Sequence, residues 1–128
     1  MHKVIIPYHH PDPPNEREIE VAWLLARHFN CTVEFLIPID DYMRKTPDIK
    51  MMGVYWEIKC PVGKSRTTIS NQFKRATKQA KHIVFDARNL RFSEADVEQS
   101  VHNQMLLRPS VRRILLINKK GKILEITR

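Results

Sequence analysis

The segment from Thr46 to Pro61 alternates apolar and polar side chains around a glycine. This pattern restricts the secondary structure that the middle of the chain can adopt. A period of two is typical of β-strands, and a glycine inside such a segment indicates a turn. Two strands that meet near Gly53 would put one apolar set on a single face: Val54, Trp56, Ile58 and Cys60. The other face would carry Tyr55, Glu57 and Lys59. The segment therefore predicts a hairpin with one core face and one charged face.

The charged face gathers residues that suit chemistry on phosphates. The turn would bring Asp48 alongside Glu57 and Lys59, and residues two apart on a strand lie about 6–7 Å from each other. Carboxylates are the ligands that hard cations prefer, and a lysine stabilises negative charge developing on a phosphate. We therefore expect Asp48, Glu57 and Lys59 to be catalytic, with Mg²⁺ or Mn²⁺ held by Asp48 and Glu57.

An Asp followed on the next strand by Glu-x-Lys resembles the motif of PD-(D/E)xK nucleases. Taken alone, Glu57-x-Lys59 also fits the solvent-exposed face of a half-buried strand. The position of Pro47-Asp48 and the basic segment that follows the motif favour the nuclease interpretation.

The remaining periodicities predict an α/β protein. Residues 1–14 are rich in proline and predict an extended arm, and residues 15–128 predict a single nuclease-like domain. Within that domain we expect helix, strand, strand, strand, helix and strand, then a third helix and a C-terminal hairpin. This αβββαβ order resembles the core of restriction-endonuclease-like proteins. Asn15 and Glu18 predict a capping box at the start of the first helix.

Charge points to a polyanionic partner. The chain has 22 Lys and Arg against 14 Asp and Glu, a net charge of +8, which suits nucleic acid. The second predicted helix carries several cations, and no acidic residue occurs between Glu57 and Asp86 to pair with them. We expect nucleic acid to contact Lys64, Arg66, Thr67, Lys74, Arg75 and Lys78, with further contacts from Arg44 and Lys45. Accessory roles at the site are expected for Glu20, Thr68 and Gln79.

The sequence gives little support for a membrane protein, a secreted protein or a zinc protein. No segment is long and apolar enough to cross a membrane or to form a secretory signal, so we expect a cytoplasmic protein without a membrane partner. Cys31 and Cys60 form no metal-binding pattern and are expected to be buried free thiols. The six histidines lack the paired spacing of a zinc site.

A set of short motifs extends along most of the chain: Glu18 and Glu20, Val33-Glu34-Phe35-Leu36, Thr46-Pro47-Asp48, Trp56-Glu57-Ile58-Lys59, Thr68-Ile69, Lys74-Arg75-Ala76 and Ile83-Val84-Phe85-Asp86. Together these motifs resemble the CdiA C-terminal tRNase domains of contact-dependent growth inhibition toxins. Cys60 departs from the serine-like residue expected there. The resemblance implies a toxin-like endoribonuclease that acts on RNA, with tRNA favoured, and an immunity protein as partner.

Other mechanisms remain open at this point. Some tRNase toxins have a metal-independent, α+β architecture of the barnase, EndoU, colicin and RelE kind. In that case Lys59, Thr67, Thr68 and His82 would matter more than Asp48. A non-catalytic nucleic-acid-binding module and a domain that binds an acidic protein are the alternatives from other classes. The sequence does not define the oligomeric state.

Overall fold

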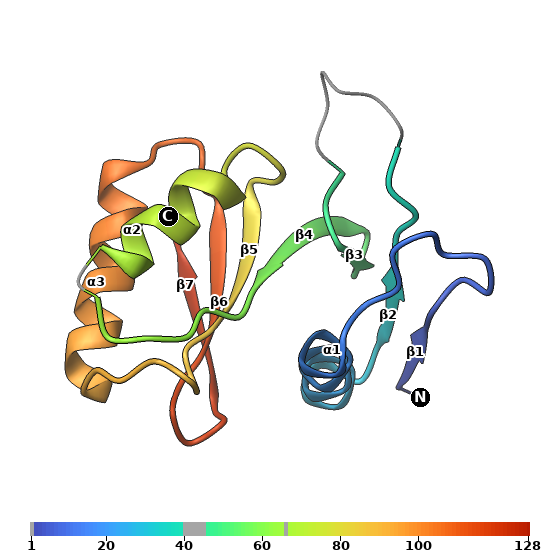
Figure 1. Cartoon of the computed structure of the whole chain (residues 1–128), viewed down its shortest axis with the longest axis horizontal. Helices are drawn as coiled ribbons and strands as arrows, with labels where there is room; N and C mark the ends of the chain where they lie inside the picture. The colour runs from blue at the N-terminus through green and yellow to red at the C-terminus, as the bar shows by residue number, and fades with distance from the viewer. Residues whose placement is uncertain (1, 40–45, 66) are drawn as a thin grey trace.

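The computed structural model describes residues 2–39, 46–65 and 67–128. In these residues it contains a seven-stranded sheet and three helices (Figure 1). The strands are β1 (Lys3–Ile5), β2 (Thr32–Phe35), β3 (Ile49–Met51), β4 (Val54–Lys59), β5 (His82–Asp86), β6 (Arg113–Ile117) and β7 (Ile123–Thr127). The helices are α1 (Glu16–Phe29), α2 (Thr68–Ala76) and α3 (Glu94–Leu107). None of these helices is long and apolar enough to span a bilayer.

The strands lie in the sheet in the same order as in the chain. β1 and β2 are parallel, β2, β3 and β4 are successively antiparallel, β4, β5 and β6 are parallel, and β7 returns antiparallel to β6. The predicted α/β class and the αβββαβ order, followed by a helix and a hairpin, are therefore confirmed. β1 is an additional strand, which forms within the segment predicted as an arm and pairs with β2.

The helices cover both faces of the sheet because successive strand residues point to opposite sides. On β5, Val84 packs in a cluster with α1, whereas Ile83 and Phe85 pack in a second cluster with α2 and α3. Figure 1 shows α1 beside β1 and β2, and α2 and α3 beside β5, β6 and β7. The core is thus divided into two layers by the sheet.

Local sequence explains the ends of α1. The Asn15 side chain accepts a hydrogen bond from the backbone N–H of Glu18, and the Glu18 side chain accepts one from the backbone N–H of Asn15, both at 2.9 Å. This is the predicted capping box, which satisfies two N–H groups that a helix start leaves without partners. Asn30 ends the helix in the left-handed conformation that asparagine tolerates.

α2 ends at Ala76, earlier than the predicted end near Lys81. Its buried residues Ile69, Phe73 and Ala76 form the predicted apolar side. After Ala76 the chain turns, because His82 must enter β5 next to β4, and the turn is held by a hydrogen bond from Thr77 Oγ1 to the carbonyl of Lys74 (3.1 Å). The shorter helix leaves Gln79 in this turn.

Candidate active site at the divergence of β3 and β4

β4 changes neighbours halfway along its length. Val54, Tyr55 and Trp56 pair with β3, whereas Glu57, Ile58 and Lys59 pair with β5. Figure 1 shows β4 crossing between the two parts of the sheet. The predicted turn is formed by Met52 and Gly53, whose φ angles of 53° and 74° match the two positive values of a type I′ hairpin. The Glu-x-Lys motif therefore lies just beyond the point where β3 stops pairing with β4.

Asp48 lies beside this point. Its backbone N–H donates to the carbonyl of Trp56 at 3.0 Å, although Trp56 is already paired with Ile49. Two residues of one strand facing a single partner form a β-bulge, which redirects a side chain. The Asp48 carboxylate accepts a hydrogen bond from the backbone N–H of Ile58 (2.8 Å). It thus occupies the β4 edge that β3 has left, next to Glu57.

Glu57 and Lys59 form an ion pair on one side of β4. Lys59 Nζ lies 3.2 Å from Glu57 Oε2 and 3.5 Å from Gln79 Oε1, to which it donates. Glu57 is only 2% exposed. The alternative interpretation of Glu57-x-Lys59, as the solvent-exposed face of a half-buried strand, is therefore wrong for Glu57. Alternation along β4 is otherwise as predicted: Trp56 and Ile58 are buried on the α1 side.

Burial and charge change the protonation of Glu57. Its removal from water, followed by the negative charge of Asp48, raises the pKa of Glu57 to about 8, although Lys59 acts in the opposite direction. In addition, Glu57 Oε1 is buried and has no hydrogen-bond partner in the described residues. A buried carboxylate with an unsatisfied oxygen beside a second carboxylate is a site poised to bind a cation or a proton.

Glu18 also lies at this site, although the sequence indicated it only as a capping residue and as part of the family resemblance. It lines a cavity together with Asp48, and burial raises its pKa, with Asp48 adding to the effect. Its capping role was recognisable from the sequence, but its closeness to Asp48 depends on how α1 meets β3. Only the fold brings these two residues together.

Glu20, expected as an accessory residue, points elsewhere. Its carboxylate accepts a hydrogen bond from Arg88, which also donates two bonds of 2.9 Å to the buried carboxylate of Asp86. These contacts link α1 to the end of β5 and pair Glu20 with Arg88.

The basic residues lie at separate places around the site. Lys74 and Arg75 are exposed near the end of α2, and Lys78 is exposed in the turn after it. Lys64 lines a different cavity, against α3, while Thr67 and Thr68 lie at the start of α2. Arg44, Lys45 and Arg66 lie outside the described residues.

Both cysteines are free thiols, as predicted, but they are partly exposed and not buried. Burial raises the pKa of Cys60 to about 12, and this keeps the thiol protonated and unreactive at neutral pH.

His82 packs its ring 5.2 Å from that of Trp56. Lys59 is in register with Phe85, so these two side chains lie on the same face of the sheet. His82 is three residues before Phe85 on the same strand and therefore lies on the opposite face.

The family model described as the contact-dependent growth inhibition CdiA C-terminal domain matches residues 45–123. No curated protein matches the chain. Among solved structures, the chain is similar to one from Burkholderia pseudomallei described as a CdiA-CT/CdiI toxin and immunity complex, with a TM-score of 0.64 and 20% sequence identity. The similarity covers 88% of this chain and 83% of that one, and at this identity it supports a common fold.

Proposed function

We propose that this chain, which belongs to the contact-dependent growth inhibition CdiA C-terminal domain family, is a toxin-like endoribonuclease that cleaves RNA and acts on tRNA in the cytoplasm. The observation that carries the proposal is the convergence of Asp48, Glu57 and Lys59 where β3 and β4 separate. This arrangement combines two carboxylates with a lysine in a partly buried site, which suits the hydrolysis of a phosphodiester.

The residues fit a divalent cation. Glu57 Oε1 is buried without a partner, and Asp48 presents a second carboxylate close by. The described residues contain no group of three or more His, Cys, Asp or Glu placed to hold a metal. Mg²⁺ often binds through one or two carboxylates, with water and substrate phosphate supplying the other ligands. Asp48 and Glu57 would therefore hold Mg²⁺ or Mn²⁺.

Each side chain has a definite task in this mechanism. A bound cation would acidify a water and stabilise charge on the phosphate. Asp48 and Glu57 would hold it through their carboxylate oxygens, which requires Glu57 to be ionised. Lys59, held between Glu57 and Gln79, keeps an ammonium beside the reacting group, where it can orient the water and stabilise the phosphate.

The exposed cations of the α2 region would hold the RNA backbone. Lys74, Arg75 and Lys78 follow one another at the end of α2 and in the turn that also contains Gln79. Because Gln79 contacts Lys59, this basic segment adjoins the carboxylate site. Phosphates bound along it would lead the strand toward Asp48 and Glu57.

An immunity protein is the partner that we propose for this chain. The similar structure from Burkholderia pseudomallei is described as a complex of a toxin with its immunity protein. A toxin of this kind requires neutralisation in the cell that produces it. An acidic partner would complement the net charge of +8.

The test is cleavage of total tRNA and of plasmid DNA by the purified chain, with Mg²⁺, with Mn²⁺ or with EDTA. We expect tRNA cleavage that EDTA stops and that Glu57→Gln reduces by at least about a hundredfold. Glu98→Gln, on α3, is the matched control and should cleave like the wild type. Full activity of a folded Glu57→Gln protein would refute the assignment.

A second mechanism has one observation in its favour. A carboxyl with a pKa of about 8 can act as a general acid or base without a metal. Cleavage that is indifferent to EDTA but lost in Glu57→Gln would identify this metal-independent reaction. A different metal-independent mechanism would use Lys59 together with His82. The structure does not favour it, because His82 lies on the opposite face of the sheet from Lys59.

A further inference from the structure

A cavity of about 280 Å³ lies next to the carboxylates of the proposed active site. Its walls come from the segment before α1, from the first turn of α1, from the end of β2 and from the residues that lead into β3. Asp48 and Glu18 both line it, so an occupant would sit beside the site where the phosphate reacts. Of the three catalytic residues proposed above, Asp48 lines this space, whereas Glu57 and Lys59 do not.

The outer wall of the cavity is fixed by His10. Its Nε2 lies 2.7 Å from the carbonyl oxygen of Leu36, and its Nδ1 accepts a hydrogen bond from the backbone N–H of Asp12 (3.1 Å). Because a carbonyl only accepts and a backbone N–H only donates, Nε2 is the donor in the first bond and Nδ1 is the acceptor in the second. The segment that contains His10 and Asp12 is thereby fastened to the end of β2. The cavity is consequently formed before any ligand arrives.

The charge of the lining argues against a phosphate as occupant. Among the described lining residues there are three carboxylates, from Asp12, Glu18 and Asp48, and neither a lysine nor an arginine. The other lining residues include Phe35, which is almost fully buried, and four prolines: Pro13, Pro14, Pro38 and Pro47. An uncharged, planar group with hydrogen-bond donors on its edge fits these walls best. In an RNA substrate that group is a nucleobase.

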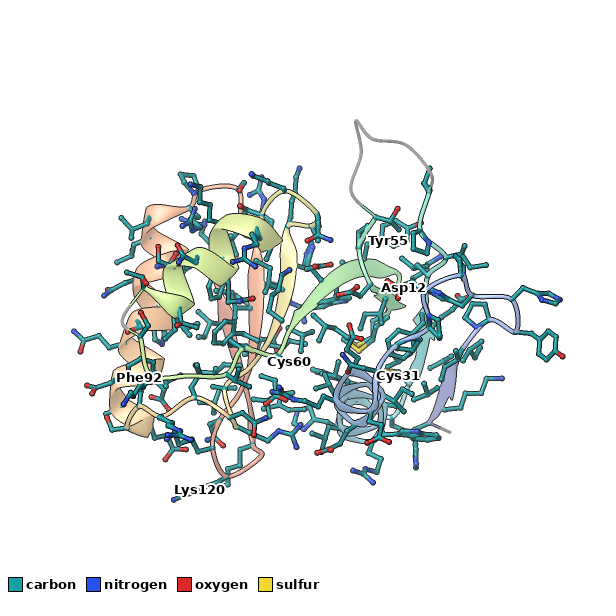
Figure 2. All side chains as sticks on the ribbon, in the orientation of Figure 1. Asp12, Cys31, Tyr55, Cys60, Phe92 and Lys120 are labelled. Carbon is teal, nitrogen blue, oxygen red and sulfur yellow. The ribbon has the colours of Figure 1, made fainter. Side chains whose placement is uncertain are left out.

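Asp12 is placed to recognise the edge of such a base. Figure 2 labels it on the segment that leads into α1, and it lines the cavity. In the described part of the chain, no hydrogen bond or ion pair uses its carboxylate. A carboxylate can accept two parallel N–H bonds. Of the four RNA bases, only guanine presents two adjacent N–H donors, N1–H and the exocyclic amine, on its pairing edge.

We propose that this cavity binds an unpaired guanine next to the scissile phosphate and that Asp12 determines this base preference. The inference rests on the proposed nuclease function and adds the substrate feature that selects the cleavage position. Glu18 and Asp48, which also line the cavity, connect base recognition to the site of hydrolysis.

The test uses short single-stranded RNAs in which each position near the cut carries guanine, inosine, adenine, cytosine or uracil. Inosine retains N1–H but lacks the exocyclic amine. We expect the wild type to prefer guanine over inosine and the other bases at one position beside the cut, by about tenfold or more in kcat/KM. Asp12→Asn should lose this preference, while Glu16→Gln, an exposed acidic residue at the start of α1 outside the cavity, should retain it.

The possible failures separate the two proposals. Cleavage without a base preference beside the cut, or with an equal guanine preference in Asp12→Asn, overturns the base pocket and leaves the carboxylate site intact. Absence of RNA cleavage by the wild type overturns both proposals. A preference for guanine that depends on Asp12 and weakens with inosine supports the base pocket.

Discussion

The Asp48 carboxylate accepts a hydrogen bond from the backbone N–H of Ile58 at 2.8 Å, and this bond occupies the edge of β4 where β3 no longer pairs. The same side chain therefore completes the strand and presents its charge to Glu57. Structure and proposed chemistry depend on one carboxylate at this position, and substitutions can separate the two roles.

Two substitutions of Asp48 should separate these roles. Asp48→Asn retains an acceptor for the Ile58 N–H but removes the negative charge, so cleavage should fall by at least about a hundredfold with little loss of stability. Asp48→Ala also leaves that N–H without its partner and should lower the free energy of unfolding by about 1–3 kcal/mol. Urea unfolding and tRNA cleavage measure the two effects. Equal stability of Asp48→Asn and Asp48→Ala would contradict the structural role.

The raised pKa of Glu57 predicts a dependence of stability on pH. Its pKa is about 8 in the folded protein and near the ordinary value of 4.5 in the unfolded chain, so the folded state holds the proton more tightly. The stabilisation is fully present below about pH 4.5 and is lost as pH rises through 8. Glu57→Gln cannot ionise and should therefore be more stable than the wild type at pH 9, by on the order of a few kcal/mol. Urea unfolding in EDTA at pH 5, 7 and 9 gives the comparison. A constant difference between the two proteins at all three values would exclude a raised pKa.

Gln79 should act as a positioning residue for Lys59. Its side-chain oxygen accepts a hydrogen bond from Lys59 Nζ, which also contacts Glu57. Gln79→Ala removes the first of these two contacts and leaves the one with Glu57. We expect kcat to fall about three- to tenfold with an unchanged KM, and Gln79→Glu to restore part of the loss by supplying an acceptor. Gln72→Ala, on α2, is the control. A fall in thermal stability without a change in kcat would assign Gln79 a merely structural role.

The basic segment predicts a salt-dependent affinity for RNA. Replacing Lys74, Arg75 and Lys78 together by Gln should weaken binding and reduce the slope of log K against log salt by about 2, since each phosphate contact on a single strand contributes about 0.7. Lys119, Lys120 and Lys122 are exposed in the connection between β6 and β7, and their triple Gln variant is a control that removes the same charge. The measurement is fluorescence anisotropy with inactive Glu57→Gln protein. Equal slopes for both variants would remove the α2 segment from the RNA interface.

The contact between Arg88 and Asp86 predicts that replacing Arg88 lowers the stability of the folded protein. Asp86 is fully buried, and Arg88→Met removes the partner that donates two hydrogen bonds to it, which should cost about 3–5 kcal/mol of stability. Glu20→Gln changes an exposed residue and should have little effect on folding or cleavage. Thermal unfolding and tRNA cleavage of both variants test this difference. Loss of cleavage in a stable Glu20→Gln protein would return Glu20 to the catalytic site.

The amino-acid sequence alone determined the local features of this protein. The period of two around Gly53, the capping box of Asn15 and Glu18, and the apolar stripe of Ile69 and Phe73 are set by residues close together in the chain. Each acts through backbone preference or through side chains one or two turns apart, so each could be predicted without knowledge of the fold. The order of the main helices and strands followed from these patterns.

Tertiary structure decided which charged groups meet. Glu18 rather than Glu20 approaches Asp48, because α1 crosses the sheet with Glu20 turned toward Arg88. Glu57 is buried because other elements cover the face of β4 that the sequence pattern alone would leave open to water. The pKa of Glu57 and the cavity beside Asp48 depend on desolvation and on contacts between distant segments. Such effects arise only when the chain is packed, since no local pattern specifies the distance between groups far apart in sequence.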